Sequence, residues 1–283
     1  MGKARRRIGG IEVKTLYVSD LDGTLLGSNG ELSQKSADII NSLIEKGMNF
    51  TVATARSASS AKLLLEKLNL KIPAVMMNGV FLTDIKAKEH KYVCPMKKDT
   101  AERIIKAFQN GGRPPFVYSF KDGNIECEYT ALKTDYEREF AKVRKQLYYR
   151  FDKVENYNIG DNNTVYINGM DDKEIIDAVI AGLNGIEGIK YSNYLDTYSG
   201  NKYFLEVYSE KAGKWNTIKK LKEMYGFEKI VAFGDNGNDV EMLKNADLAV
   251  AVGNAQPIAK SSADIIIGSN DEDGVAQFLL GQI

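Results

Sequence analysis

Short apolar runs alternate with amphipathic stretches in the first part of the chain. Leu16–Val18, Met48–Ala53 and Pro73–Met77 have the length and composition of buried strands. Between them, apolar residues recur at intervals of three and four, which predicts two helices, the first beginning after the N-cap Ser33 and ending near Gly47. Because strands that alternate with helices pair in parallel, this part of the chain predicts an α/β fold.

The rhythm changes from about Val80, where pairs of strands flank polar turns. Val80–Thr83 and Lys91–Cys94 form one such pair, and Phe116–Phe120 and Ile125–Tyr129 form another. Stretches of helical periodicity follow each pair. This middle section therefore predicts antiparallel hairpins with helices, an α+β domain inserted into the first one.

The alternation of buried strands and helices returns in the last part of the chain. We interpret Phe204–Tyr208 and Ile230–Phe233 as further strands of the parallel sheet. The predicted organisation is a discontinuous catalytic core of residues 1–82 and 193–283, and an inserted α/β domain of residues 83–192.

Composition excludes several classes of protein. The 283 residues suit about two domains, and 38 basic residues balance 38 acidic ones, which argues against a general nucleic-acid binder. No apolar run is long enough to predict a membrane span. The basic segment Met1–Arg7 lacks the apolar region that follows in a signal peptide, so we expect a flexible tail. A cytoplasmic protein, monomeric or homodimeric, is expected.

Cysteine and histidine are too scarce for several common chemistries. Cys94 and Cys127 lie far apart without a Cys-x-x-Cys spacing, so we expect buried core residues rather than a disulfide or a zinc site. His90 is the single histidine and lies in a polar, turn-like stretch. Carboxylates are therefore the expected acid and base of any catalytic site.

Polar side chains follow several of the predicted parallel strands. These strand-end residues are Asp20, Asp22, Thr54, Asn78, Asp235, Asn238 and Asp239. Each polar segment alone would equally suit an ordinary turn. Parallel strands, however, bring their carboxyl ends to one edge of a sheet, where ligands bind. Carboxylates gathered there raise one another's pKa, and a bound divalent cation relieves the repulsion, magnesium suiting oxygen ligands best.

The combination of motifs resembles the haloacid dehalogenase-like (HAD) superfamily, and most closely its Cof-type sugar-phosphatase-like subfamily. Four family motifs are matched by Asp20–Thr24 (Asp-x-Asp-Gly-Thr), Thr54, Lys214 and Gly234–Asp239 (Gly-Asp-x-x-Asn-Asp). Two departures occur, because Ala55 and Trp215 stand where the family usually has glycine, and both would narrow the phosphate pocket. The resemblance covers both flanks of the chain, and the middle is similar to the subfamily's cap in position and size.

The resemblance implies a Rossmann-like HAD core with an inserted α+β cap, and a magnesium-dependent phosphatase acting through an aspartyl-phosphate. The implied substrates are small phosphomonoesters, such as sugar phosphates. Asp20 would be the nucleophile and Asp22 the general acid and base. The implied phosphate-binding residues are Leu21, Thr54, Ala55, Lys214 and Asn238. The implied metal-site residues are Asp20, Asp22, Asp235, Asn236 and Asp239. A phosphomutase or phosphotransferase and a non-catalytic phosphate-binding regulatory protein remain the alternatives.

Overall fold

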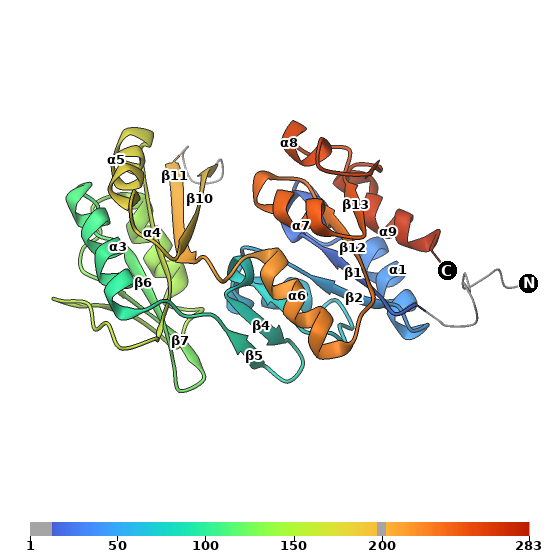
Figure 1. Ribbon diagram of the computed structural model, residues 1–283, viewed down its shortest axis with the longest axis horizontal. Helices are drawn as coiled ribbons and strands as arrows, with labels where there is room; N and C mark the ends of the chain where they lie inside the picture. Colours follow the sequence, from blue (N-terminus) through green and yellow to red (C-terminus); the bar gives the residue numbers. More distant parts are fainter. Residues whose placement is uncertain (1–12, 197–201, 283) are drawn as a thin grey trace, which may run out of the picture. The chain divides into compact units, whose positions relative to one another are not determined.

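The computed structural model describes residues 13–196 and 202–282 (Figure 1). The chain divides into two compact units. Residues Met1–Tyr92 and Gly213–Ile283 form the first, here called the core unit, and Val93–Ala212 form the second, here called the inserted unit. A discontinuous core interrupted by one insertion therefore agrees with the sequence prediction in kind. The predicted basic tail, Met1–Arg7, lies outside the described residues.

The unit boundaries differ from the predicted ones at both ends of the insertion. β4 (Phe81–Asp84) pairs with β3 (Ala74–Met76) and neighbours β5 (Glu89–Val93), so the first predicted hairpin belongs to the core unit rather than to residues 83–192. The prediction that Phe204–Tyr208 resumes the parallel sheet is wrong, because β11 (Lys202–Ser209) pairs antiparallel with a strand of the inserted unit. An apolar run predicts a buried strand but not the sheet that the strand joins.

The core unit is built on a parallel sheet, as predicted. The sheet has five strands in the order β14-β13-β12-β1-β2. Its strands are, in that order, Ile265–Ile266, Leu248–Ala251, Lys229–Gly234, Thr15–Ser19 and Asn49–Val52. The third predicted strand, β3, is connected to β2 by a parallel bridge between Ala53 and Val75, and pairs antiparallel with β4. β3 therefore extends the sheet edge and starts a small second sheet.

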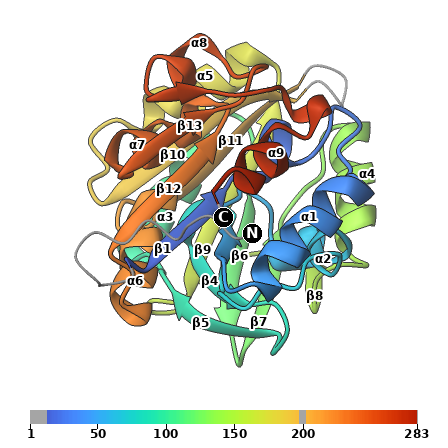
Figure 2. The ribbon, with the colours of Figure 1, turned by 90° about the vertical axis from the view of Figure 1, so that its right-hand side faces the viewer.

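Helices cover both faces of the parallel sheet, with α1 and α9 on one side and α6 and α7 on the other (Figure 2). The helices of the core unit are α1 (Gln34–Glu45), α2 (Ala58–Leu65), α6 (Lys214–Tyr225), α7 (Val240–Asn245), α8 (Pro257–Lys260) and α9 (Gly274–Leu280). The side chain of Ser33 accepts a hydrogen bond from the Ser36 amide, which confirms the predicted N-cap. Because both faces are covered, the strands are mostly apolar, as in other parallel sheets, although Ser19 and Thr51 are buried polar residues.

The inserted unit contains a six-stranded mixed sheet with the order β10-β11-β9-β6-β7-β8. These strands are Ile189–Asp196, Lys202–Ser209, Thr164–Asp171, Phe116–Lys121, Asn124–Tyr129 and Arg150–Lys153. The pairing of β6 with β7 confirms the second predicted hairpin. The helices of this unit are α3 (Lys98–Asn110), α4 (Asp135–Arg144) and α5 (Lys173–Leu183).

Alternation along the strands divides the side chains of this sheet between two layers. Ile167 and Leu205 belong to a buried apolar cluster that includes α3 and α5 residues. On the opposite face, the ring of Phe140 from α4 lies 5.1 Å from that of Phe116 and 5.9 Å from that of Phe204. The inserted unit thus has its own core on each side of its sheet.

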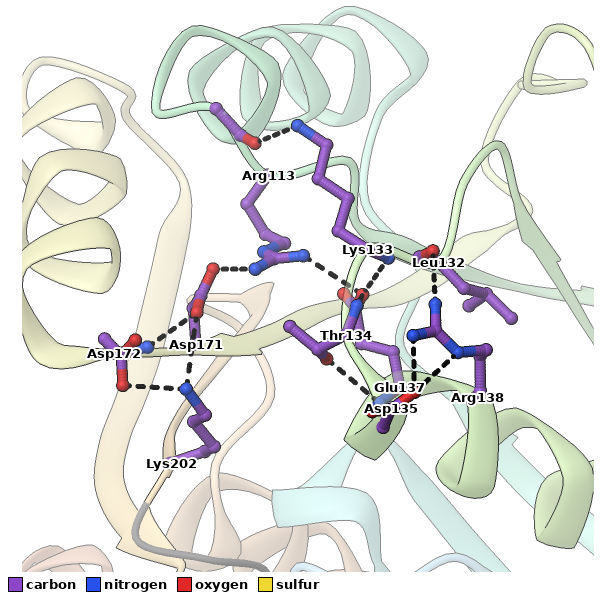
Figure 3. Close-up of polar contacts among 11 residues, drawn as sticks. Arg113, Leu132, Lys133, Thr134, Asp135, Glu137, Arg138, Asp171, Asp172 and Lys202 are labelled. Carbon is purple, nitrogen blue, oxygen red and sulfur yellow. Dashed lines mark hydrogen bonds and ion pairs between the residues drawn. The ribbon is translucent and has the colours of Figure 1, made fainter.

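A buried arginine connects separate segments of the inserted unit (Figure 3). Arg113 follows α3 and forms ion pairs with Glu137 of α4, at 3.0 Å, and with Asp171 at the end of β9. All three side chains are at most 8% exposed. Glu137 also accepts hydrogen bonds from the amides of Lys133 and Thr134, so it caps the N-terminus of α4 as well.

The remaining sequence expectations concern cysteines and membrane spans. Cys94 and Cys127 are both buried free thiols, as predicted. In the described ranges, no helix combines the length and apolarity needed to cross a membrane.

Candidate active site

Two neighbouring parallel strands place the first two carboxylates of the site. β1 and β12 pair in register, with Ser19 opposite Phe233, and Asp20 and Asp235 follow at their carboxyl ends. The amide of Asp20 donates to the carbonyl of Phe233 at 3.0 Å, which extends the pairing to Asp20. The strand ends therefore bring together residues more than 200 positions apart in the sequence.

The turn after β1 needs a glycine and contributes a hydroxyl to the site. Gly23 has a φ of +76°, and a Cβ atom there would lie 2.5 Å from Asp235 Oδ2. The next residue, Thr24, donates its hydroxyl to Asp235 Oδ1 at 2.8 Å. The side chain of Asn254 donates to the carbonyl of Gly23 at 2.7 Å. Hydrogen bonds thus hold this turn to the segments that follow β12 and β13.

Three carboxylates lie close together, and two of them bind the buried ammonium group of Lys214. Oxygens of Asp20, Asp235 and Asp239 all lie within 4.8 Å of one another. Lys214 Nζ donates to Asp20 Oδ1 at 2.6 Å and to Asp239 Oδ1 at 2.7 Å. Asp20, Lys214 and Asp239 are at most 5% exposed, so these charges interact with little screening by water.

Burial and mutual repulsion perturb the pKa values of the cluster. Burial raises the pKa of Asp20 well above its usual range, Lys214 opposes that rise, and Asp239 and Asp235 add to it. Burial and then Asp239 raise the pKa of Asp235 to about 6. Burial by itself would lower the pKa of Lys214, but Asp20 and Asp239 raise it above its ordinary value. The site thus holds more negative charge than one ammonium group balances.

The start of α6 is docked closely enough to fix the position of Lys214. The amide of Gly213, the residue before α6, donates to the carbonyl of Asn78 at 2.9 Å, and the hydroxyl of Thr217 donates to the carbonyl of Gly79 at 2.6 Å. A Cβ atom on Gly79 would lie 2.2 Å from the Gly213 carbonyl oxygen. Two glycines therefore allow the β3–β4 loop and α6 to meet backbone to backbone.

Asp239 organises the loop after β12. Its Oδ2 atom accepts hydrogen bonds from the amides of Asp235 at 3.0 Å and Asn236 at 3.1 Å. Its Oδ1 atom is bound to Lys214. Both oxygens of Asp239 are therefore engaged. Within the part of the chain that the structure describes, Asp20 Oδ2 and Asp235 Oδ2 accept no hydrogen bond.

The residues predicted to bind phosphate follow β1 or β2, lie in the loop after β12, or begin α6. Thr54, Leu21 and Lys214 are buried, Ala55 is half-buried, and Asn238 is exposed. The hydroxyl of Thr54 accepts a hydrogen bond from the amide of Arg56 at 3.1 Å, so it shapes the loop after β2. The predicted phosphate-binding role of these residues remains a prediction.

Two of the predicted metal-site side chains lie outside the carboxylate cluster. Asn236 Oδ1 accepts from the amide of Gly237 at 2.6 Å and so caps the turn after β12. The carboxylate of Asp22 is paired with Arg56.

Sequence reasoning assigned no role to two residues that the structure brings to the site. Thr24 belongs to the Asp-x-Asp-Gly-Thr motif, which could have pointed to its contact with Asp235. Arg56 follows Thr54 and Ala55 at the end of a predicted strand. That position is the one sequence feature that could have pointed to its place in the site. The pattern of apolar and polar residues along the chain does not show which side chains reach across to a neighbouring strand end.

A family model for haloacid dehalogenase-like hydrolases matches residues 17–279 of the chain. The chain belongs to this family. The match includes every residue of the carboxylate cluster and both units, so the resemblance read from the four motifs is confirmed for the chain as a whole.

Curated relatives of similar length are phosphatases. Phosphatase YwpJ of Bacillus subtilis is 25% identical, over 93% of this chain and 98% of its own. The 5-amino-6-(5-phospho-D-ribitylamino)uracil phosphatase YcsE of the same organism is 26% identical, over 94% of each chain. These relatives confirm the expected class, a HAD-family phosphatase.

Solved structures confirm the fold. A haloacid dehalogenase-like hydrolase from Bacteroides thetaiotaomicron aligns with a TM-score of 0.77 at 24% identity, over 95% of this chain and 100% of its own. A HAD subclass IIB sugar phosphatase aligns with a TM-score of 0.70 at 19% identity, over 96% of this chain and all of its own. An α/β core with a separate sheet-rich insertion is therefore an architecture that this family uses.

The carboxylate cluster fits a magnesium ion. Asp20 and Asp235 offer carboxylate oxygens, the hard ligands that magnesium takes. A cation that shared these oxygens would favour their ionised forms and offset the excess negative charge that raises the pKa of Asp235.

Proposed function

We propose that this protein is a magnesium-dependent phosphatase that hydrolyses small phosphomonoesters through an aspartyl-phosphate formed on Asp20. One observation carries the proposal. The buried Asp20 carboxylate has one oxygen fixed by Lys214 at 2.6 Å and a second oxygen without a hydrogen bond from any described residue. A carboxylate that is held at one oxygen and available at the other is oriented as a nucleophile.

In the first half-reaction, the available oxygen of Asp20 attacks phosphorus. A bond forms between this oxygen and phosphorus while the bond from phosphorus to the leaving oxygen breaks. Asp22 donates a proton to the leaving oxygen, which departs as an alcohol. The products of this step are the free alcohol and the phosphorylated Asp20.

In the second half-reaction, water attacks the phosphorus of the aspartyl-phosphate and gives its proton to Asp22. The bond between phosphorus and the Asp20 oxygen breaks, which releases inorganic phosphate and restores the carboxylate. Asp22 then carries the proton needed for the next cycle.

Lys214 supplies positive charge to the phosphoryl group throughout. It is fixed at the start of a twelve-residue helix, whose N-terminus adds partial positive charge beside an anion. We assign the remaining phosphate contacts to the hydroxyl of Thr54, the side chain of Asn238 and the backbone amides of Leu21 and Ala55. Donors placed before the reaction begins stabilise the charge that develops in the transition state.

Magnesium would be held by the carboxylate of Asp235, by the Asp20 oxygen that also accepts from Lys214, and by the backbone carbonyl of Asp22, which leaves the other Asp20 oxygen for the attack on phosphorus. Asp239 and Asn236 would support the metal loop, because Asp239 already binds the amides of Asp235 and Asn236. When bound, the cation supplies charge that reduces repulsion between the Asp20 carboxylate and the phosphate.

The proposed substrates are small phosphorylated metabolites. The printed names of related proteins include a sugar phosphatase and phosphatases of a ribitylaminouracil phosphate, and both substrates carry the phosphate on a polyhydroxylated carbon chain. We therefore propose a phosphorylated sugar or sugar alcohol moiety as the first class to screen.

The test is direct detection of the intermediate. The wild type, mixed with a phosphomonoester and magnesium and quenched in acid, should carry one phosphoryl group on the peptide that contains Asp20, by mass spectrometry. Asp20→Asn should carry none and should release no phosphate. Turnover that required an added bisphosphate or alcohol acceptor would instead indicate a phosphomutase or phosphotransferase. Labelling of a different residue would contradict the proposal.

A further inference from the structure

Arg56 holds the side chain of Asp22 by both of its carboxylate oxygens. Arg56 Nε donates to Asp22 Oδ2 at 2.8 Å, and one terminal nitrogen of the guanidinium group donates to Asp22 Oδ1 at 2.5 Å. Two parallel hydrogen bonds between a planar guanidinium and a carboxylate fix the orientation of the carboxylate as well as its position.

The backbones of both residues are anchored, so the contact constrains the side chain of Asp22 rather than two mobile loops. The amide of Arg56 donates to Thr54 Oγ1 at 3.1 Å, and its carbonyl accepts from the amide of Met77 at 3.0 Å. Asp22 lies in the turn after β1, which is closed by a hydrogen bond from the amide of Leu26 to the carbonyl of Leu21 at 2.9 Å.

The exposure of this pair argues against a role in stability. The Arg56 side chain is 30% exposed and that of Asp22 is 51% exposed. Ion pairs in contact with water contribute little to folding, because water and salt screen the attraction. Stability alone therefore does not account for a bidentate pair on Asp22, which lies two residues after the proposed nucleophile.

We propose that Arg56 is a positioning residue for Asp22 in proton transfer to the leaving oxygen. This inference rests on the proposed function, in which Asp22 is the general acid and base. The guanidinium group can bind both oxygens of the carboxylate. When the carboxyl group carries a proton, the guanidinium group can still bind the unprotonated oxygen. In both states the freedom of the Asp22 side chain to rotate is reduced.

Positioning matters most when the leaving oxygen needs a proton. A strongly basic leaving group departs slowly unless a proton reaches it in the transition state, whereas a weakly basic one departs as an anion. Loss of Arg56 should therefore slow substrates with basic leaving groups more than substrates with good ones. A general distortion of the site would slow both classes equally.

The experiment measures kcat/KM for a series of substituted phenyl phosphates, from 4-nitrophenyl phosphate to phenyl phosphate, with magnesium present. Asp22→Asn should lose on the order of 100-fold on phenyl phosphate and clearly less on 4-nitrophenyl phosphate. Arg56→Gln should show the same selectivity with a loss of about tenfold on phenyl phosphate, since Asp22 remains but is less well placed. Arg56→Lys should recover part of that loss, because it restores the charge without the planar fork.

Two further variants complete the comparison. Lys67→Gln removes another exposed ion pair of the core unit, that of Lys67 with Glu31 at 3.2 Å, and should leave the series unchanged. Asp22→Asn combined with Arg56→Gln should be no slower than Asp22→Asn alone, because Arg56 acts through Asp22.

The outcomes separate this inference from the proposed function. If Asp22→Asn is selective and Arg56→Gln slows all substrates equally, or none, the positioning role of Arg56 is overturned and the role of Asp22 stands. If Asp22→Asn shows no dependence on the leaving group, proton transfer by Asp22 is overturned and the role of Arg56 with it. Detection of the phosphorylated Asp20 is independent of both results.

Discussion

The ammonium group of Lys214 lies 2.6 Å from a carboxylate oxygen of Asp20, although 194 positions separate the two residues in the sequence. The contact joins the start of α6 to the end of β1. It places the one fully buried cation of the described core unit directly beside the proposed nucleophile.

Lys214→Ala should lower kcat/KM by an amount equivalent to about 3 kcal/mol of transition-state stabilisation, the scale of one preorganised donor. Lys211 is the matched control, because it is an exposed lysine three positions earlier. Lys211→Ala should change kcat/KM by less than about threefold, as expected for a surface substitution. Both variants are measured on one substrate, and circular dichroism checks that each is folded. A larger loss for Lys211→Ala would move the assignment to that residue.

Much of this arrangement could be predicted from the sequence, for a physical reason. Asp20 and Asp235 each follow directly after an apolar run, and the ends of parallel strands meet at one edge of the sheet. To predict that Asp20 and Asp235 lie at the same edge, it was therefore enough to predict that both strands belong to the parallel sheet. The confirmed α1 N-cap at Ser33 is a local feature of the same kind, since it depends on residues three positions apart.

The sequence did not predict features that depend on pairing partners or rotamers. β11 has the apolar composition of a core strand, yet it pairs antiparallel with β9, and composition does not distinguish the two pairings. The contact of Arg56 with Asp22 spans 34 positions and depends on the direction of one long side chain. Asp239 was predicted in the metal site, but its hydrogen bond to Lys214 depends on how the turn after β12 folds.

Gly79→Ala should reduce both stability and activity. The added Cβ atom would lie 2.2 Å from the Gly213 carbonyl oxygen and would push the start of α6 away from the β3–β4 loop. We expect a loss of about 3 kcal/mol in the free energy of unfolding, as for overpacking combined with backbone strain. Gly30→Ala is the control, since Gly30 also has a positive φ, of +75°, but a Cβ there would meet no atom within 4 Å. It should cost only about 1 kcal/mol.

The measurements for this pair are urea unfolding and kcat/KM. Because Gly79 supports the start of α6, Gly79→Ala should also lower kcat/KM in the fraction that remains folded, whereas Gly30→Ala should not. Equal unfolding free energies for the two variants would show that the β3–β4 loop and α6 can separate without cost.

Removal of divalent cations should abolish turnover. A chelator should reduce the rate to the background level, and magnesium should restore it, because Asp20 and Asp235 offer the oxygen donors that magnesium takes. Calcium should inhibit, since its larger and more flexible coordination shell would engage additional carboxylate oxygens, including that of the nucleophile. Phosphate release is the measurement. Full activity after chelation, with metal content verified by mass spectrometry, would rule out the proposed metal dependence.

The buried ion pairs of Arg113 give the last prediction, which concerns the stability of the inserted unit. Arg113 contacts Glu137 and Asp171, and all three side chains are at most 8% exposed (Figure 3). Arg113→Met would leave the buried Glu137 carboxylate without a cation and would leave Asp171 with only Lys202, at 3.9 Å, which should lower the free energy of unfolding by about 3–5 kcal/mol.

A matched arginine is available in the same unit. Arg138 forms an ion pair with Asp135 at 2.5 Å, but its side chain is 53% exposed and that of Asp135 is 98% exposed. Arg138→Met should therefore change the free energy of unfolding by at most about 1 kcal/mol. Adding Glu137→Gln to Arg113→Met should recover part of the loss, because glutamine removes one unpaired charge and can still accept from the amides that cap α4. Equal stability of Arg113→Met and Arg138→Met in urea would show that the buried ion pairs of Arg113 contribute no more to folding than an exposed pair. The capping hydrogen bonds alone would then hold the N-terminus of α4.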